Sequence, residues 1–188
     1  MPITGTGWEL HVIRHSEQRR PSNGKRRTVG TYQVYHDGKA QDGTGLSGTI
    51  AETRGPGANA PENNNRRIEA GRYPLYTQDG AKYVTNGYKD SESPSVKPKP
   101  GLELKDTGER TEILIHPGIG FVASVGCFNP CTSLPDDQEM IDYLPSRRRV
   151  IAIIDDLRKF IKGFPDKNGR RIEGAFVVVD GEPELPDQ

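Results

Sequence analysis

Residues 111–131 have the sequence TEILIHPGIGFVASVGCFNPC, in which a short apolar run gives way to a glycine-rich loop. The run at residues 113–115 is typical of a buried strand, and it leads directly into His116 and a Pro-Gly break. Cys127 follows eleven residues after His116. A nucleophilic cysteine needs a group that favours its thiolate, and histidine is the usual partner. We therefore expect His116 to lie beside Cys127 and to keep it as a thiolate at neutral pH.

The composition favours a loop-rich, mainly β protein of 188 residues, with 22 glycines, 15 prolines and 32% hydrophobic residues. Its 26 basic residues balance its 26 acidic residues, which argues against a general nucleic-acid binder. No apolar run approaches the ~20 residues that cross a membrane. The first residues lack the pattern of a signal peptide. We expect no membrane span, and export only by a dedicated system.

Alternating apolar residues predict three strands at the start of the chain, over residues 8–15, 27–36 and 46–54. Trp8, Leu10 and Val12 would share one face of the first strand. The dipeptide Asp37-Gly38 predicts a tight hairpin after the second. These strands form an N-terminal meander within residues 1–54.

Further elements complete a single domain of the mainly β (α+β) class. Residues 67–76 are expected to form a strand with a bend or bulge at Gly71, and Pro74 would restrict it to the edge of a sheet or the end of a strand. Apolar residues at helical spacing predict an amphipathic helix that begins after Ser146 as N-cap and ends near Gly163. A short helix is expected at residues 136–144 and a buried strand at 175–179. The polar residues 87–101 form either a lid or a disordered insertion.

These elements divide the expected domain into a catalytic-like core at residues 66–131, a helix with a final strand at 146–180, and an acidic tail at 181–188. The predicted body is antiparallel, with one helix laid across it.

Residues around Cys127 suggest supporting roles in such a site. The N–H groups of Gly126 and Cys127 would stabilise an oxyanion, and the glycines at 118 and 120 would leave further N–H groups accessible. Ser124 and Asn129 could orient a histidine or hold a substrate carbonyl. The plain alternative is that Cys127 is a small buried hydrophobic residue and His116 an ordinary strand-end residue.

Two segments, IHPG at 115–118 and SVGC at 124–127, resemble the active-site signature of YkuD-like L,D-transpeptidases. That family has a histidine at a strand end, a glycine-containing loop, and then a Ser/Thr-His-Gly-Cys motif. Val125 occupies the place of the family's second histidine, and Asn129 a place where many members have arginine. Residues 68–73 also resemble a strand found in small bacterial and phage-encoded proteins of unassigned function.

This resemblance implies an L,D-transpeptidase (YkuD)-like fold and cysteine acyl transfer on peptidoglycan stem peptides, by transpeptidation or L,D-carboxypeptidase cleavage. Cys127 would be the nucleophile and His116 the general base. Substrate contacts are expected from Arg72, Tyr73 and Gly118. If the protein is delivered as an antibacterial effector, its partners would include an immunity protein or a secretion apparatus. It would then act in the periplasm or on the cell wall.

Other arrangements of the same residues stay open. Cys127 and Cys131 could form a disulfide or a redox switch. Zinc held by His116, Cys127 and Cys131 matches no common spacing, so neither a metal nor a cofactor is expected. A binding or structural module with a degenerate transpeptidase fold is the alternative to an enzyme.

Overall fold

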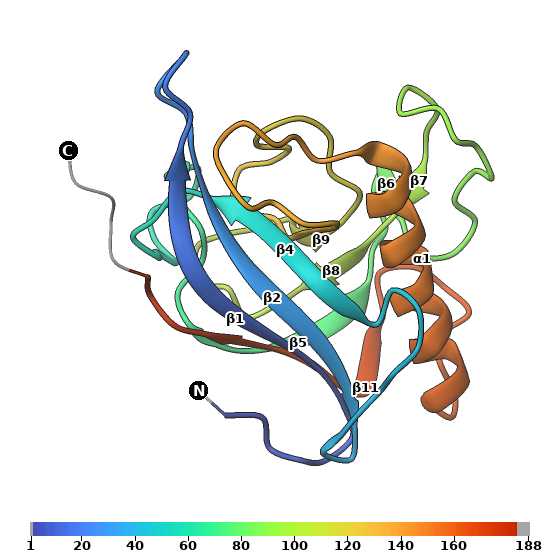
Figure 1. The fold of residues 1–188 in the computed structure, drawn as a ribbon. Helices are drawn as coiled ribbons and strands as arrows, with labels where there is room; N and C mark the ends of the chain where they lie inside the picture. The colour runs from blue at the N-terminus through green and yellow to red at the C-terminus, as the bar shows by residue number, and fades with distance from the viewer. Residues whose placement is uncertain (1, 184–188) are drawn as a thin grey trace.

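A computed structural model describes residues 2–183 as a curled β-sheet with one helix, α1 (Tyr143–Phe160). The sheet runs in the order β10-β4-β2-β1-β11-β5-β8-β9 and curls into a nearly closed, barrel-like shape (Figure 1). Its strands, in chain order, are β1 (Trp8–Arg19), β2 (Arg26–His36), β4 (Ser47–Thr53), β5 (Gly71–Thr77), β8 (Leu102–Leu104), β9 (Ile113–Ile115), β10 (Asn129–Cys131) and β11 (Arg171–Asp180). The expectation of a mainly β fold with one late helix is confirmed.

The three N-terminal strands pair as the sequence predicts, β1 with β2 and β2 with β4. Trp8, Leu10 and Val12 are fully buried on the inner face of β1. After β2 the chain turns at Asp37 and Gly38, both with positive φ, and β3 (Lys39–Ala40) pairs back on β2. Positive φ at both central residues is what a tight hairpin requires, and this explains the Asp-Gly pair.

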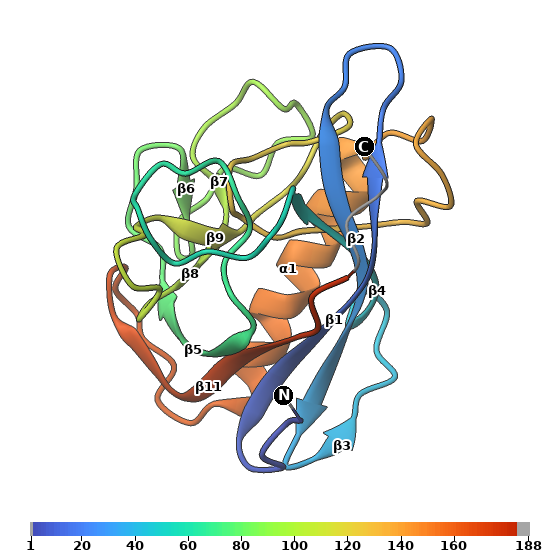
Figure 2. The ribbon, with the colours of Figure 1, turned by 90° about the vertical axis from the view of Figure 1, so that its left-hand side faces the viewer.

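Helix α1 covers one side of the curled sheet (Figure 1). In Figure 2 it is seen behind the strands, with β1, β2 and β4 on one side of the view and β5 and β11 on the other. Its apolar stripe is fully buried in the main core, together with Trp8, Leu10 and Leu75 from the strands. The stripe consists of Val150, Ile153, Ile154 and Leu157. Burying this stripe stabilises both the helix and the curl of the sheet.

Buried ion pairs join β1, β4 and the segments after β4 and β11. Both oxygens of Glu52 accept from Arg14, at 2.7 and 2.8 Å. The guanidinium of Arg67 contacts Glu17 at 3.0 Å and Glu182 at 2.7 Å. The side chains of Arg14, Arg67 and Glu17 are completely buried. Each of these charges therefore has a fixed partner of opposite sign.

Four expectations about the elements are wrong. Helix α1 begins at Tyr143 with Asp142 as N-cap, so Ser146 lies inside the helix, where its hydroxyl donates to the carbonyl of Pro130 at 2.5 Å. Residues 136–142 contain no helix. The sheet is mixed, because β1 and β11 are parallel. Pro74 lies in a strand that is paired on both sides, next to an irregularity in the β5–β11 pairing that accommodates its missing N–H.

Residues 87–101 lie beside the start of α1. Arg147 donates to the carbonyl of Lys89 at 3.0 Å, and Arg148 lies 3.6 Å from Glu92. The segment ends in β7 (Lys99–Pro100), which pairs in parallel with β6 (Tyr83–Val84). No helix among residues 2–183 is both long and apolar enough to cross a membrane.

Candidate active site at the closure of the sheet

The two ends of the sheet meet where β9 passes the residues just before β10. Ile115 and Phe128 form a parallel bridge there. The N–H of His116 donates to the carbonyl of Phe128 at 3.0 Å, and the N–H of Phe128 donates to that of Leu114 at 2.7 Å. Because side chains alternate along a strand, the residues on either side of each bridge partner point to the same face. His116, Leu114, Cys127 and Asn129 therefore share one face of this seam.

His116 and Cys127 line one cavity of about 390 Å³, as their spacing predicts. The two side chains are diagonal neighbours across the seam, since His116 lies beside Asn129 and Cys127 beside Leu114. Within the described chain no hydrogen bond joins Cys127 to His116. The remaining lining residues come from two segments, residues 78–83 and 112–125: Gln78, Gly80, Ala81, Lys82, Tyr83, Glu112, Leu114, Ala123, Ser124 and Val125.

His116 is buried and held from three sides. Its Nδ1 lies 2.9 Å from the carbonyl oxygen of Pro117, and Asn129 Nδ2 donates to the carbonyl of His116 at 2.9 Å. The ring of Tyr83 packs against the imidazole with 4.4 Å between centroids. A carbonyl can only accept, so the contact with Pro117 requires the proton on Nδ1. Nε2 is then left with a lone pair, which is the form a general base needs.

Burial and nearby lysines keep His116 neutral. Loss of hydration lowers its pKa to about 4; the hydrogen bond to Pro117 opposes this shift, and the positive charges of Lys82 and Lys99 reinforce it. The two ammonium groups lie 5.2 and 5.9 Å from the centre of the Tyr83 ring. Sequence patterns gave no sign of Tyr83, Lys82 or Lys99, because they come from β6, β7 and the residue before β6.

The surroundings of Cys127 favour its thiol form over the thiolate that we expected from the sequence. Burial raises its pKa to about 11, and the charge of Arg110 only partly offsets this effect. Its Sγ accepts from the N–H of Leu114 at 3.3 Å and donates to the carbonyl of Glu112 at 3.4 Å. The pair therefore rests as thiol and neutral imidazole, and its proton must move during a reaction.

The backbone N–H groups of the glycines near Cys127 differ in whether they are already hydrogen-bonded. The N–H of Gly118 donates to Ser146 Oγ at 2.8 Å, and that of Gly120 to the carbonyl of Ile141 at 3.0 Å, so neither is free for a substrate. Within residues 2–183 no hydrogen bond engages the N–H of Gly126 or Cys127, the two groups that we expected to stabilise an oxyanion.

Both the backbone conformation and the packing around Gly126 require a glycine. Its φ of +103° is unfavourable for other residues, and an added Cβ would collide with Arg110 Nη2. Arg110 donates to Asn64 Oδ1 at 2.8 Å and to the carbonyl of Val125 at 3.2 Å. This arginine thus ties the loop before Cys127 to the segment after β4, a role that its position in the sequence does not reveal.

Ser124 and Asn129 both reach the site. Ser124 Oγ lies 3.4 Å from Asn129 Oδ1 and 3.3 Å from the carbonyl oxygen of Cys127. Asn129 lies 3.3 Å from His116 Nδ1, besides its bond to the His116 carbonyl. Of the two roles considered for these residues, the geometry fits orientation of the histidine.

Three expected substrate contacts lie outside the cavity. Arg72 stacks on Phe176 at 3.2 Å, and the hydroxyl of Tyr73 donates to the carbonyl of Glu69 at 2.7 Å. Both belong to β5, which β8 separates from β9. Gly118 does not line the cavity and packs against Asn129 and Ile141.

Neither a disulfide nor a metal cluster accounts for the cysteines. Both are free thiols that pack in different hydrophobic clusters, Cys127 with Tyr83 and Leu114, and Cys131 with Val29 and Leu134. The part of the chain that the structure describes contains no group of three or more metal-ligating side chains suited to an ion.

Comparison with models of protein families, with curated proteins and with solved structures gives no match to this chain.

Proposed function

We propose that His116 and Cys127 carry out cysteine-dependent acyl transfer on peptidoglycan stem peptides, of the L,D-transpeptidase or L,D-carboxypeptidase type. The observation that carries the proposal is the arrangement at the seam. A histidine anchored through Nδ1 to Pro117 and a cysteine line the same cavity, and among the described residues no hydrogen bond engages the N–H groups of Gly126 and Cys127. The sequence resemblance to YkuD-like L,D-transpeptidases at these residues supports both the chemistry and a related fold.

The reaction would begin when the Cys127 thiol passes its proton to His116 Nε2 and Sγ attacks the peptide carbonyl. The oxyanion would accept from the N–H groups of Gly126 and Cys127. His116 would return the proton to the departing amine, leaving a thioester. A water or an acceptor amine, deprotonated by His116, would then attack the thioester and release Cys127, which regains its proton.

Charges at the cavity fit a substrate that carries both a carboxylate and an amine. Lys82 and Lys99 offer positive charge near His116, and Glu112 offers negative charge near Cys127. A bound carboxylate would cancel the field of the lysines and so raise the pKa of His116, which makes it a better base. Stem peptides with free carboxylates and a diamino-acid side chain provide both groups. The protein would meet them in the periplasm or on the cell wall after export.

The test is incubation with a disaccharide tetrapeptide, with mass spectrometry to detect loss of the terminal D-alanine or its exchange for an added D-amino acid. Cys127→Ala should abolish product, and His116→Ala should lower the rate about 10²–10⁴-fold. Cys131→Ala is the matched control, since this second buried cysteine lies outside the cavity, and it should retain activity. Absence of product with several stem peptides would refute the proposed activity.

A non-catalytic binding module is the second candidate, favoured by the hydrogen bonds of Cys127 to the main chain rather than to His116. In that case tetrapeptide would bind to the wild type and to Cys127→Ala equally, without turnover. Calorimetric titration of both proteins distinguishes the two candidates.

A further inference from the structure

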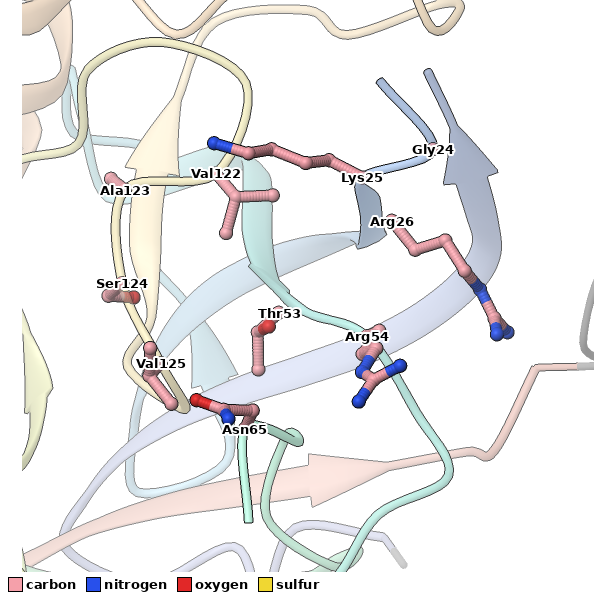
Figure 3. Close-up of a pocket in the computed structure, with 10 residues that line it drawn as sticks. All are labelled: Gly24, Lys25, Arg26, Thr53, Arg54, Asn65, Val122, Ala123, Ser124 and Val125. Carbon is pink, nitrogen blue, oxygen red and sulfur yellow. The ribbon is translucent and has the colours of Figure 1, made fainter. Parts of the chain in front are cut away.

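A second cavity lies on the other side of the loop that precedes Cys127. It has a volume of about 540 Å³ and is formed by the turn between β1 and β2, the end of β4, and residues 122–125 (Figure 3). Ala123, Ser124 and Val125 line both this cavity and the one that contains His116 and Cys127. We refer to it as the Lys25–Arg54 cavity.

Positive charge in the Lys25–Arg54 cavity lacks a counter-charge. None of the described residues that line it is acidic, whereas Lys25, Arg26 and Arg54 are basic. Arg26 pairs with Glu17, and in Figure 3 its side chain turns away from the wall at Val122. Within residues 2–183 the side chains of Lys25 and Arg54 have no carboxylate partner. A concave surface of one sign concentrates ions of the opposite sign.

Neutral donors accompany these two cations. The side chains of Thr53 and Asn65 line the cavity, and among the described residues neither forms a hydrogen bond. In Figure 3 the amide of Asn65 points toward Val125, and Lys25 extends over the cavity toward Val122. The cavity is thus lined by four side chains that can form further hydrogen bonds: Lys25, Thr53, Arg54 and Asn65.

The walls and the size indicate what kind of anion fits. Val122 and Val125 contribute apolar surface opposite Arg54. The volume lies in the range of about 300–1,000 Å³ that is typical of sites for small organic molecules. A bare inorganic anion would leave the apolar wall and most of the space unused.

We propose that the Lys25–Arg54 cavity is a binding site for a small organic polycarboxylate. Lys25 and Arg54 bind separate carboxylates, Thr53 and Asn65 donate hydrogen bonds, and the carbon skeleton packs on Val122 and Val125. The site is independent of the acyl-transfer chemistry proposed for Cys127.

Calorimetric titration with tricarballylate, a three-carbon tricarboxylate, tests this site. The titration uses the full chain with Cys127→Ala, so that the outcome does not depend on thiol chemistry. We expect saturable binding with a Kd below about 1 mM at low salt, which weakens as salt is raised because the contacts are ionic. Lys25→Gln and Arg54→Gln should each weaken binding by at least about fivefold.

Lys39→Gln is the matched control, because Lys39 is an exposed lysine on β3 outside the cavity. It should bind tricarballylate like the parent protein. Both test positions are exposed and lack side-chain hydrogen bonds, so we expect each variant to keep the parent's unfolding midpoint. Absence of binding, or equal weakening in the control, would overturn the site. Inorganic phosphate binding as tightly as tricarballylate would overturn the assignment to an organic ligand.

Discussion

Arg14 and His116 are both almost completely buried, but their surroundings act on charge in opposite ways. Burial by itself would lower the pKa of Arg14, but the charge and hydrogen bonds of Glu52, together with the charge of Glu182, outweigh it and raise the pKa. His116 faces Pro117, Asn129 and Tyr83, none of which carries a charge, so burial dominates and lowers its pKa. The charge of Arg14 on β1 can therefore be buried, because β4 holds the opposite charge of Glu52 against it. At the seam the surroundings favour the neutral forms of His116 and Cys127.

Removing Arg14 should produce the largest effect. Arg14→Met leaves Glu52, which is 3% exposed, without its bidentate partner. An uncompensated buried charge of this kind costs about 3–5 kcal/mol. Equilibrium unfolding in urea at pH 7 measures the loss.

The double variant Arg14→Met, Glu52→Met is the control for this comparison. Replacing both charges by apolar side chains should recover most of the stability, since no buried charge is left alone. If the single variant lost less than about 1 kcal/mol, the ion pair would not be the reason that the charge of Arg14 can be buried.

Acid should destabilise the seam through His116. The pKa of His116 is about 4 in the folded protein and has a reference value of 6.5, so the unfolded chain binds the proton more tightly. The stabilising contribution of neutral His116 is thus complete above pH 6.5 and is lost as the pH falls toward 4. It amounts to about 3 kcal/mol over this interval.

Comparing the wild type with His116→Gln isolates this contribution. Urea unfolding at a series of pH values should give two curves that differ in slope between pH 6.5 and 4 and run parallel elsewhere. Parallel curves throughout would mean that His116 titrates normally in the folded state.

Burial of Cys127 should slow its alkylation. The pKa of the thiol is about 11, against a reference value of 9.0, so the folded protein contains about 100-fold less thiolate at pH 8. In a Cys131→Ala background, native protein should react with iodoacetamide about 100-fold more slowly than protein unfolded in urea. Mass spectrometry follows the reaction. Rates within a factor of about 3 of each other would contradict the neutral thiol.

Much of the fold could be predicted because its signals are local. The alternation in β1, the Asp-Gly turn and the apolar stripe of α1 each arise from neighbouring residues, and all three are present. Errors occurred where tertiary contacts override local preference. Ser146 has the chemistry of an N-cap, but its hydroxyl bonds Pro130 and Gly118 inside the core instead.

The site was predicted only in part. Spacing and residue type singled out His116, Cys127, Ser124 and Asn129, which do converge, because they lie on two short segments that are close in the chain. Lys82, Tyr83 and Arg110 could not be found this way, since they reach the site from segments that carry no motif.

The sequence by itself singled out Cys127 and His116 as the candidate nucleophile and base, because side-chain chemistry and local periodicity depend on neighbouring positions. Only the tertiary structure decided their protonation states and their surroundings. Burial, nearby charge and free N–H groups depend on how β6, β7 and the residue 112–127 segment pack around the closing seam. It also brought Lys25 and Arg54 together at a second cavity. These properties depend on contacts between residues far apart in the chain, and such contacts produce no pattern among neighbouring residues from which they could be predicted.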